Sequence, residues 1–174
     1  FSKQEPAYCC EFTSSLASPT CIAGGNCTLN GFDHKGDENF WQVCGDSVCA
    51  ICVLPPWQAN QEPWIVVATQ DYEVRCSQAD VLKEGFETSE SDEIVAMVDV
   101  GWKHHPTSSN DPAMYNLAYG TYSDGCSTYG LWAGPNRPQG QVKPFTRAWR
   151  KKQKGRIVGM AALDTGKSEG CKDI

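Results

Sequence analysis

The sequence predicts a mainly β protein with one or two short helices, and three observations support this class. Short apolar runs rich in β-branched residues recur between Gly, Pro and Asn residues, a pattern typical of antiparallel strands. The chain is 40% apolar and 21% charged, so it is expected to be globular. Ten cysteines among 174 residues indicate a covalent framework. We therefore expect a disulfide-stapled N-terminal module followed by a C-terminal β-sandwich or barrel-like module.

The cysteines predict both a compartment and a domain boundary. An even, high count in a short chain is typical of oxidising compartments, and only the Cys49/Cys52 pair has the spacing of half a zinc site. Eight cysteines precede residue 77. We expect four bridges within residues 1–76 and one in residues 77–174, with the N-terminal connectivity left open. The expected disulfide cysteines are Cys9, Cys10, Cys21, Cys27, Cys44, Cys49, Cys52, Cys76, Cys126 and Cys171.

The first half of the chain predicts two helices and four strands. Tyr8, Phe12 and Leu16 recur every four residues, which favours a helix over 5–17. The Gly- and Asn-rich stretch 20–36 is expected to be a loop. Ser77 and Gly85 are a plausible start and stop for a second helix. Strands are expected over 40–44, 48–54, 64–69 and 72–76, and this second helix over 78–84.

The second half predicts further short strands and no internal repeat. The acidic run 84–93 is expected to be a solvated loop, and Asp111 could cap a single helical turn that ends at Leu117. The spacing of the strands favours a sandwich or a partly closed barrel. They are expected over 94–100, 118–122, 129–132, 142–149 and 156–163.

The chain is expected to be secreted, extracellular and monomeric. No apolar run approaches the roughly 20 residues that span a bilayer. Phe1 at the start fits cleavage of a leader. Asn26 begins the sequon Asn26-Cys27-Thr28 and is a glycosylation candidate.

Enzymatic signatures are thin, and neither a cofactor nor a metal is expected. His104 and His105 follow the strongest predicted strand, where one of them could be the general base of a small secreted hydrolase. Adjacent strand residues point to opposite faces, so surface histidines are the favoured interpretation.

Charge is divided unevenly along the chain. Residues 1–136 carry 18 acidic and 5 basic residues, whereas residues 137–174 carry 3 acidic and 10 basic residues. The segment 147–156 is the most basic and is expected at a hairpin tip, where it could bind anionic groups or pair with the protein's own acidic face. Its candidate binding residues are Arg147, Trp149, Arg150, Lys151, Lys152, Lys154 and Arg156.

A carbohydrate-binding function is the second alternative. Trp57 and Trp132 flank Pro- and Gly-containing loops and could stack on sugar rings, although packing in turns or in the core is favoured.

The cysteine-dense first half and the strand-rich second half, Ile94 to Leu163, resemble in layout the secreted dual-domain effectors of plant-pathogenic fungi. The resemblance implies a non-enzymatic virulence effector that acts on a host target. The partners it implies are a host protein, an anionic glycan or lipid surface, or an immune receptor, without stable nucleic-acid binding.

Overall fold

The computed structural model describes residues 7–13, 20–56, 61–78, 81–104, 114–123, 125–132 and 144–163. Within these ranges the regular structure consists of twelve β-strands, and no helix is present. The mainly β class is therefore confirmed, and the predicted short helices are absent from the described residues. No helix of the described ranges is long and apolar enough to cross a membrane.

Three four-stranded antiparallel sheets make up the fold, and consecutive strands pair in each. The first sheet contains β1 (Ala7–Thr13), β2 (Thr20–Gly25), β3 (Thr28–Phe32) and β4 (Glu38–Val43). The second contains β5 (Val48–Leu54), β6 (Trp64–Thr69), β7 (Glu73–Gln78) and β8 (Val81–Ser89). The third contains β9 (Ile94–His104), β10 (Met114–Thr121), β11 (Gly125–Trp132) and β12 (Phe145–Lys152).

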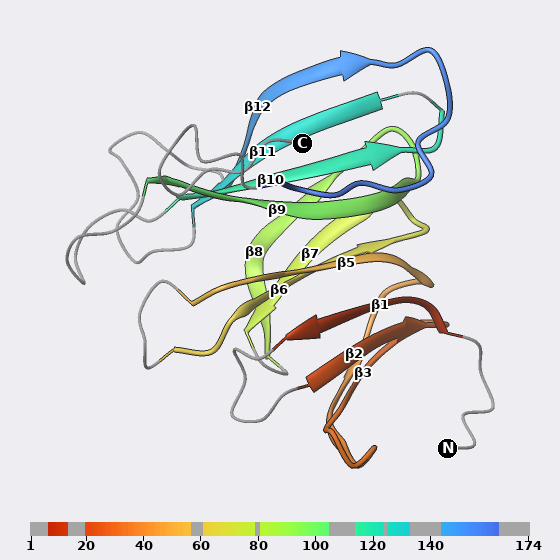
Figure 1. Cartoon of the computed structure of the whole chain (residues 1–174), viewed down its shortest axis with the longest axis vertical. Coiled ribbons are helices and arrows are strands. Elements are labelled where there is room, and N and C mark those ends of the chain that lie inside the picture. The colour runs from red at the N-terminus through yellow and green to blue at the C-terminus, as the bar shows by residue number, and fades with distance from the viewer. Residues whose placement is uncertain are drawn as a thin grey trace.

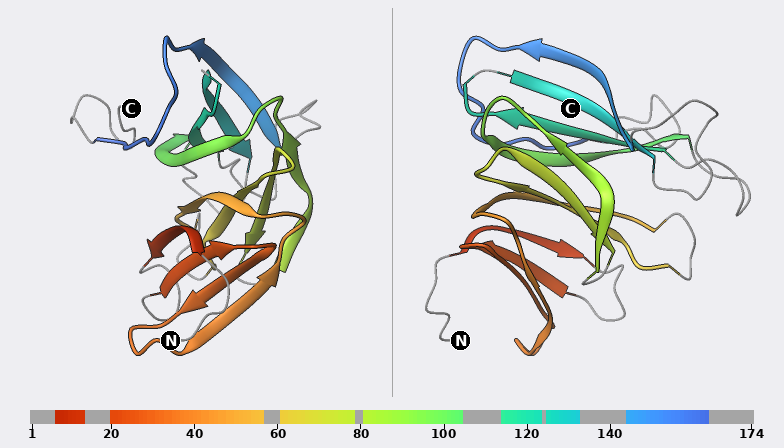
Figure 2. Two further views of the ribbon diagram at one scale, coloured as in Figure 1. Left: turned by 90° about the vertical axis from the view of Figure 1, so that its right-hand side faces the viewer. Right: turned by 180° about the vertical axis from the view of Figure 1, so that it is seen from behind.

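The sheets lie one above another in chain order (Figure 1). Strands β1, β5 and β9 form neighbouring inner edges, since β5 contacts both of the others. Strands β4, β8 and β12 are the outer edges, and the views from the side and from behind show the sheets spreading apart toward them (Figure 2). Successive four-stranded meanders that radiate from their first strands are the arrangement of β-propeller blades, not of a sandwich.

Two apolar cores hold the sheets together. The core between the first and second sheets brings together Ile22, Leu29, Val48, Ile51, Ile65 and Val67. The approach is close at Gly24, where an added Cβ would lie 2.5 Å from Cγ1 of Val48. The larger core between the second and third sheets includes Leu54, Trp64, Val66, Tyr115, Leu117, Tyr119, Leu131 and Phe145.

The three inner strands share one irregularity, a β-bulge at their second residue. Pairing skips Tyr8 between Ala7↔Gly25 and Cys9↔Gly24. It skips Cys49 in the second sheet and Val95 in the third sheet at the same position. Strands β1, β5 and β9 begin at residues 7, 48 and 94, so the unit repeats about every 40 to 46 residues. The structure thus contains a repeat that the sequence reading did not recognise.

Each later inner strand is also tied to the hairpin turn of its own sheet. The carbonyl of Ser47, directly before β5, accepts a hydrogen bond from the Gln70 amide at 2.9 Å. The carbonyl of Glu93, directly before β9, accepts one from the Tyr122 amide at 2.8 Å. The two hydrogen bonds are equivalent, and the segments that form them also match in sequence. Residues 45–51 (GDSVCAI) align with residues 91–97 (SDEIVAM), a match that becomes visible once the fold is known.

The helix predicted over 5–17 is wrong, because residues 7–13 form β1. A spacing of four residues is even, so Tyr8 and Phe12 also share one face of a strand. The helix predicted over 78–84 is wrong as well, since Gln78 pairs with Val81 across a hairpin. Gly85 lies inside β8 with a φ of 77°. The helical turn ending at Leu117 is replaced by β10 from Met114 onward.

Other expected elements are partly confirmed. Strands over 48–54 and 64–69 have the predicted bounds, and the other predicted strands up to residue 149 overlap observed ones. The loops expected over 20–36 and 84–93 are largely the strands β2, β3 and β8, whereas 156–163 contains only a single bridge residue. The boundary after residue 76 falls inside β7, and the two-module division stays a prediction.

Leu117→Ala tests the packing of the second and third sheets. Leu117 is fully buried between them, so the truncation leaves a cavity and should lower the free energy of unfolding by about 2–5 kcal/mol. Val43→Ala is the control, because Val43 is 60% exposed and should change stability by less than about 0.5 kcal/mol. Equal midpoints of the two variants in urea unfolding would contradict the packing described.

Candidate functional site

The basic segment lies along the outer edge of the third sheet, not at a hairpin tip. Among the described strands β12 pairs only with β11, and every residue of β12 after Phe145 is exposed. Trp149 is 45% exposed. The candidate binding residues Arg147, Trp149, Arg150, Lys151 and Lys152 are part of the strand, and Lys154 and Arg156 follow it.

Arg147 anchors this strand to a buried carboxylate. Its Nη2 lies 2.6 Å from Oε1 of Glu90, whose side chain is only 1% exposed. Its Nε donates to the Tyr129 hydroxyl at 2.6 Å. The Tyr119 and Tyr129 hydroxyls also donate to Oε1 of Glu90. One oxygen from the segment between the second and third sheets therefore accepts bonds from β10, β11 and β12.

The Glu90 carboxylate is held in its charged form. Burial by itself would raise its pKa, but the hydrogen bonds from Tyr119, Tyr129 and Arg147 lower it, and the pKa ends below the usual 4.5. The pKa of Tyr119 is raised, first by burial and then by the neighbouring carboxylate. The hydroxyls thus stay protonated and act as donors. We call Glu90, Tyr119, Tyr129 and Arg147 the Glu90 cluster.

The remaining cations differ in how they are held. The guanidinium carbon of Arg156 lies 4.1 Å from the centre of the Tyr122 ring. Within the described ranges the ion pairs involve Arg75 and Arg147 and leave out Arg150, Lys151 and Lys154. The outer part of β12 is therefore an exposed basic row next to an anchored arginine.

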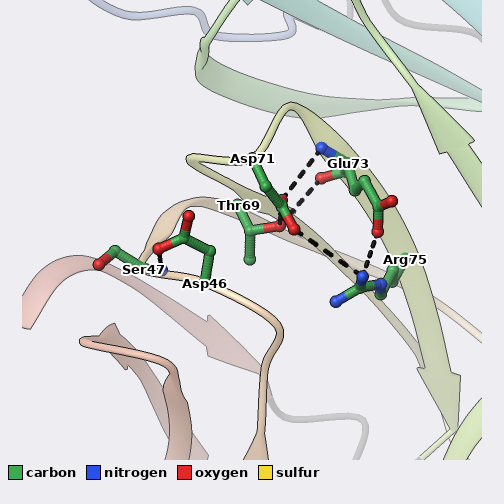
Figure 3. A network of polar contacts seen from close by, with 6 residues as sticks. All are labelled: Asp46, Ser47, Thr69, Asp71, Glu73 and Arg75. Carbon is green, nitrogen blue, oxygen red and sulfur yellow. Dashed lines mark hydrogen bonds and ion pairs between the residues drawn. The ribbon is translucent and has the colours of Figure 1, made fainter.

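A second polar cluster lies at the hairpin of the second sheet (Figure 3). The Thr69 hydroxyl donates to Asp71, which also accepts from the Glu73 amide at 3.3 Å. Arg75 pairs with Glu73 and lies 3.8 Å from Asp71. These contacts tie the β6–β7 turn together. Thr69 is buried, whereas Asp71, Glu73 and Arg75 are partly exposed, and their contacts are local to the hairpin, which they stabilise.

The cysteines do not form the expected framework. None of the nine described cysteines is in a disulfide, and Cys171 lies outside the described residues. Cys52 and Cys76 are buried in the core between the second and third sheets, where they pack as small apolar residues. Burial raises the pKa of the Cys9 and Cys44 thiols to about 11. The disulfide-stapled part of the predicted fold is therefore unsupported.

The other candidate residues are not brought together by the described structure. Trp57 and His105 lie outside the described residues, as do the side chains of His104 and Trp132. Asn26 is exposed and accepts a hydrogen bond from the Tyr8 hydroxyl at 3.0 Å, and its glycosylation stays a prediction. Among the described side chains, no group of three His, Cys, Asp or Glu residues is placed to hold a metal ion.

The sequence is similar to a subunit of the BBSome complex. BBSome complex member BBS2 of Rattus norvegicus is 30% identical over 159 residues, which cover 91% of this chain, and the Homo sapiens protein matches over the same length. The Caenorhabditis elegans protein bbs-2 is 35% identical over 77 residues. The chain spans only 18% of the length of the rat and human relatives. No family model matches.

The fold is similar to that of the solved protein BBS1N. A crystal structure of BBS1N in complex with ARL6DN superposes with a TM-score of 0.68 at 12% identity, and the match covers 99% of this chain and 49% of that chain. A second crystal structure of the same complex gives a TM-score of 0.56 over 89% of this chain. The likeness shows the fold alone. It is that of part of a β-propeller.

These similarities correct the sequence-based reading of function. The resemblance to fungal effectors is wrong, because 91% of the chain matches part of BBS2 at 30% identity. The secreted, extracellular virulence protein is wrong for the same reason, and its basis, a disulfide framework, is not found among the described cysteines. The host-protein, immune-receptor and glycan or lipid partners are likewise overturned by relatives that are members of a multi-subunit complex.

Sequence reasoning missed Glu90 because it lies in an acidic run that reads as solvated. Its partners are 29, 39 and 57 residues away in the chain. The signal in the sequence was Tyr119 and Tyr129, which lie ten residues apart in two successive predicted strands, followed by Arg147 in the next predicted strand. That signal becomes meaningful only when the strand order is known.

Glu90→Gln tests the cluster. The amide keeps the size of the side chain but removes the charge that Arg147 faces, so unfolding free energy should fall by about 1–3 kcal/mol. Because the folded pKa lies below 4.5, the charged form contributes fully above that pH and its contribution is lost as pH falls through the folded pKa. The stability difference from wild type, measured by urea unfolding, should therefore shrink in acid. The exposed Glu87→Gln is the control, and a difference that grows in acid would contradict the assignment.

Thiol labelling tests the free cysteines. Iodoacetamide should modify the exposed Cys10, Cys21 and Cys27 before the buried Cys52 and Cys76 in the native, unreduced protein. Burial raises the pKa of Cys76, which lowers its reactivity further. Peptide mass spectrometry gives the order. A disulfide between any two of the nine described cysteines would contradict the structure.

Proposed function

We propose that this chain is a propeller segment of a BBSome subunit and acts as a protein-binding scaffold in a complex that serves ciliary trafficking. The observation that supports it is the 30% identity to BBS2, which extends over 91% of the chain. The likeness of the fold to BBS1N, solved in complex with ARL6DN, supports a propeller. A rigid stack of sheets with exposed edges suits assembly with other proteins.

Residues 157–163 support a propeller larger than the three described sheets. The sequence Ile157-Val158-Gly159-Met160 repeats that of Ile94-Val95-Ala96-Met97 at the start of β9. Ile94 and Met97 are buried, whereas their counterparts Ile157 and Met160 are only half-buried, and Val158 is 89% and Leu163 67% exposed. The segment has the sequence of an inner strand, but its apolar side chains are not buried by a neighbouring sheet. Such exposure is expected where a further sheet packs. We assign 157–163 to the inner strand of a fourth unit.

Co-purification from cells tests the scaffold. The tagged full chain should recover BBSome subunits, identified by mass spectrometry, and Leu117→Asp should lose them because a charge in the core disrupts the sheets. The exposed Val43→Asp introduces the same charge outside both cores, so it is the control for the fold and should keep the circular dichroism spectrum of the wild type. Recovery of a folded wild-type chain without any BBSome subunit would contradict the proposal.

A further inference from the structure

Strand β12 differs from the two other outer edge strands. The three strands β4, β8 and β12 hold the same position in their sheets. Strand β4 has no Lys or Arg, and β8 has one Lys against two Glu, whereas β12 has four cations in eight residues. Charges on an exposed edge often serve only to prevent unwanted pairing. Strand β4 holds the same position with a single charge, Glu38, so edge protection does not require the four cations of β12.

The cations of β12 lie on both faces of the sheet. Arg150, Lys151 and Lys152 pair in turn with Ser127, Cys126 and Gly125 of β11. Since successive strand residues point to opposite faces, Lys151 lies on one face and Arg150 and Lys152 on the other. Trp149 shares the face of Lys151. The backbone edge of the sheet runs between these two sets of charges.

The edge is also held in place. Arg147 joins β12 to the buried Glu90 carboxylate, so the strand that presents the cations is fixed to the sheet core. Arg150 and Lys151 have no ion pair in the described part of the chain. A fixed edge with unneutralised charge loses little conformational entropy when a ligand binds.

We propose that β12 binds an acidic, extended segment of a partner protein, which adds to the third sheet as a fifth strand. Main-chain hydrogen bonds supply the pairing in this mode of recognition. Carboxylates on alternate faces of the added strand lie opposite Lys151 on one side and Arg150 and Lys152 on the other, as favourable cross-strand charge pairs. The charge and position of β12 support this pairing independently of the proposed BBSome role.

The arrangement favours a peptide over a nucleic acid. Single-stranded nucleic acids bind grooves that combine cations with several aromatic rings on one surface. Strand β12 divides its cations between two faces and offers one exposed ring, that of Trp149. A strand with alternating side chains fits this distribution of charge.

Fluorescence anisotropy with the full chain tests the proposal. The probe is the labelled peptide Glu-Glu-Thr-Thr-Glu-Glu-Thr-Thr, which carries Glu on both faces when extended. It should bind, and binding should weaken between about 50 mM and about 500 mM NaCl, because salt screens exposed charges. The double variant Arg150→Glu and Lys151→Glu should bind the peptide about tenfold more weakly. Both side chains are exposed, so the variant should keep its fold.

Three controls separate this mode of binding from others. The double variant Lys35→Glu and Lys83→Glu has the same net charge change away from β12 and should bind like wild type. The same peptide with every backbone amide methylated has no main-chain donor on either edge, so it cannot pair as a strand and should bind at least several-fold more weakly. The proposal would be overturned if the control variant bound the peptide as weakly as the β12 variant, or if the methylated peptide bound as well as the unmethylated one. It would also be overturned if a thymidine oligonucleotide of equal charge bound more tightly than the peptide.

Discussion

Strand β6 is buried along its whole length because sheets pack against both of its faces. Ile65 and Val67 contact the first sheet, and Val66 and Ala68 contact the third. This double burial explains why the sequence Trp64–Thr69 is apolar without alternation. The remaining structure depends on it, since the first and third sheets each pack against the second and contribute few large buried residues of their own outside these two cores.

The polar features are secondary to this packing and join its edges. The Glu90 cluster links the segment after β8 to β10, β11 and β12, so it fixes the third sheet against the second. The Thr69–Arg75 contacts fix the hairpin next to the inner strand. Neither is arranged like a catalytic centre. Both hold exposed edges of the sheets in a constant position, which is consistent with the proposed scaffold.

The strands of the fold were largely predictable, and their arrangement was not. Residues 48–54 and 64–69 are continuous apolar runs that only a buried strand satisfies, so their bounds were right. Residues 7–13 were misread because Tyr8 and Phe12 fit a helix and a strand equally well. The repeat was hidden because only the bulged inner strands, such as Val48–Leu54 and Ile94–His104, retain similar residues, whereas the outer strands differ in length and charge.

The site was predictable in part. The basic residues 147–156 were recognised from charge alone, but their position on an edge strand and the burial of Glu90 depend on pairing between distant segments. The cysteines misled because their even, high number was taken as evidence of disulfides. Cys52 of β5 and Cys76 of β7 are the cross-strand partners of Val66 in β6. Small apolar side chains are needed at these buried positions whether or not a disulfide can form.

Native-state hydrogen exchange measures the central claim, that one continuous packing interaction holds the three sheets. The amides of β6 and β10 should be the most protected and should exchange with a common opening free energy, whereas the amides at the outer edges of β4 and β12 exchange faster. The claim would be contradicted if the residues up to β7 opened as one unit while β9 to β12 stayed protected.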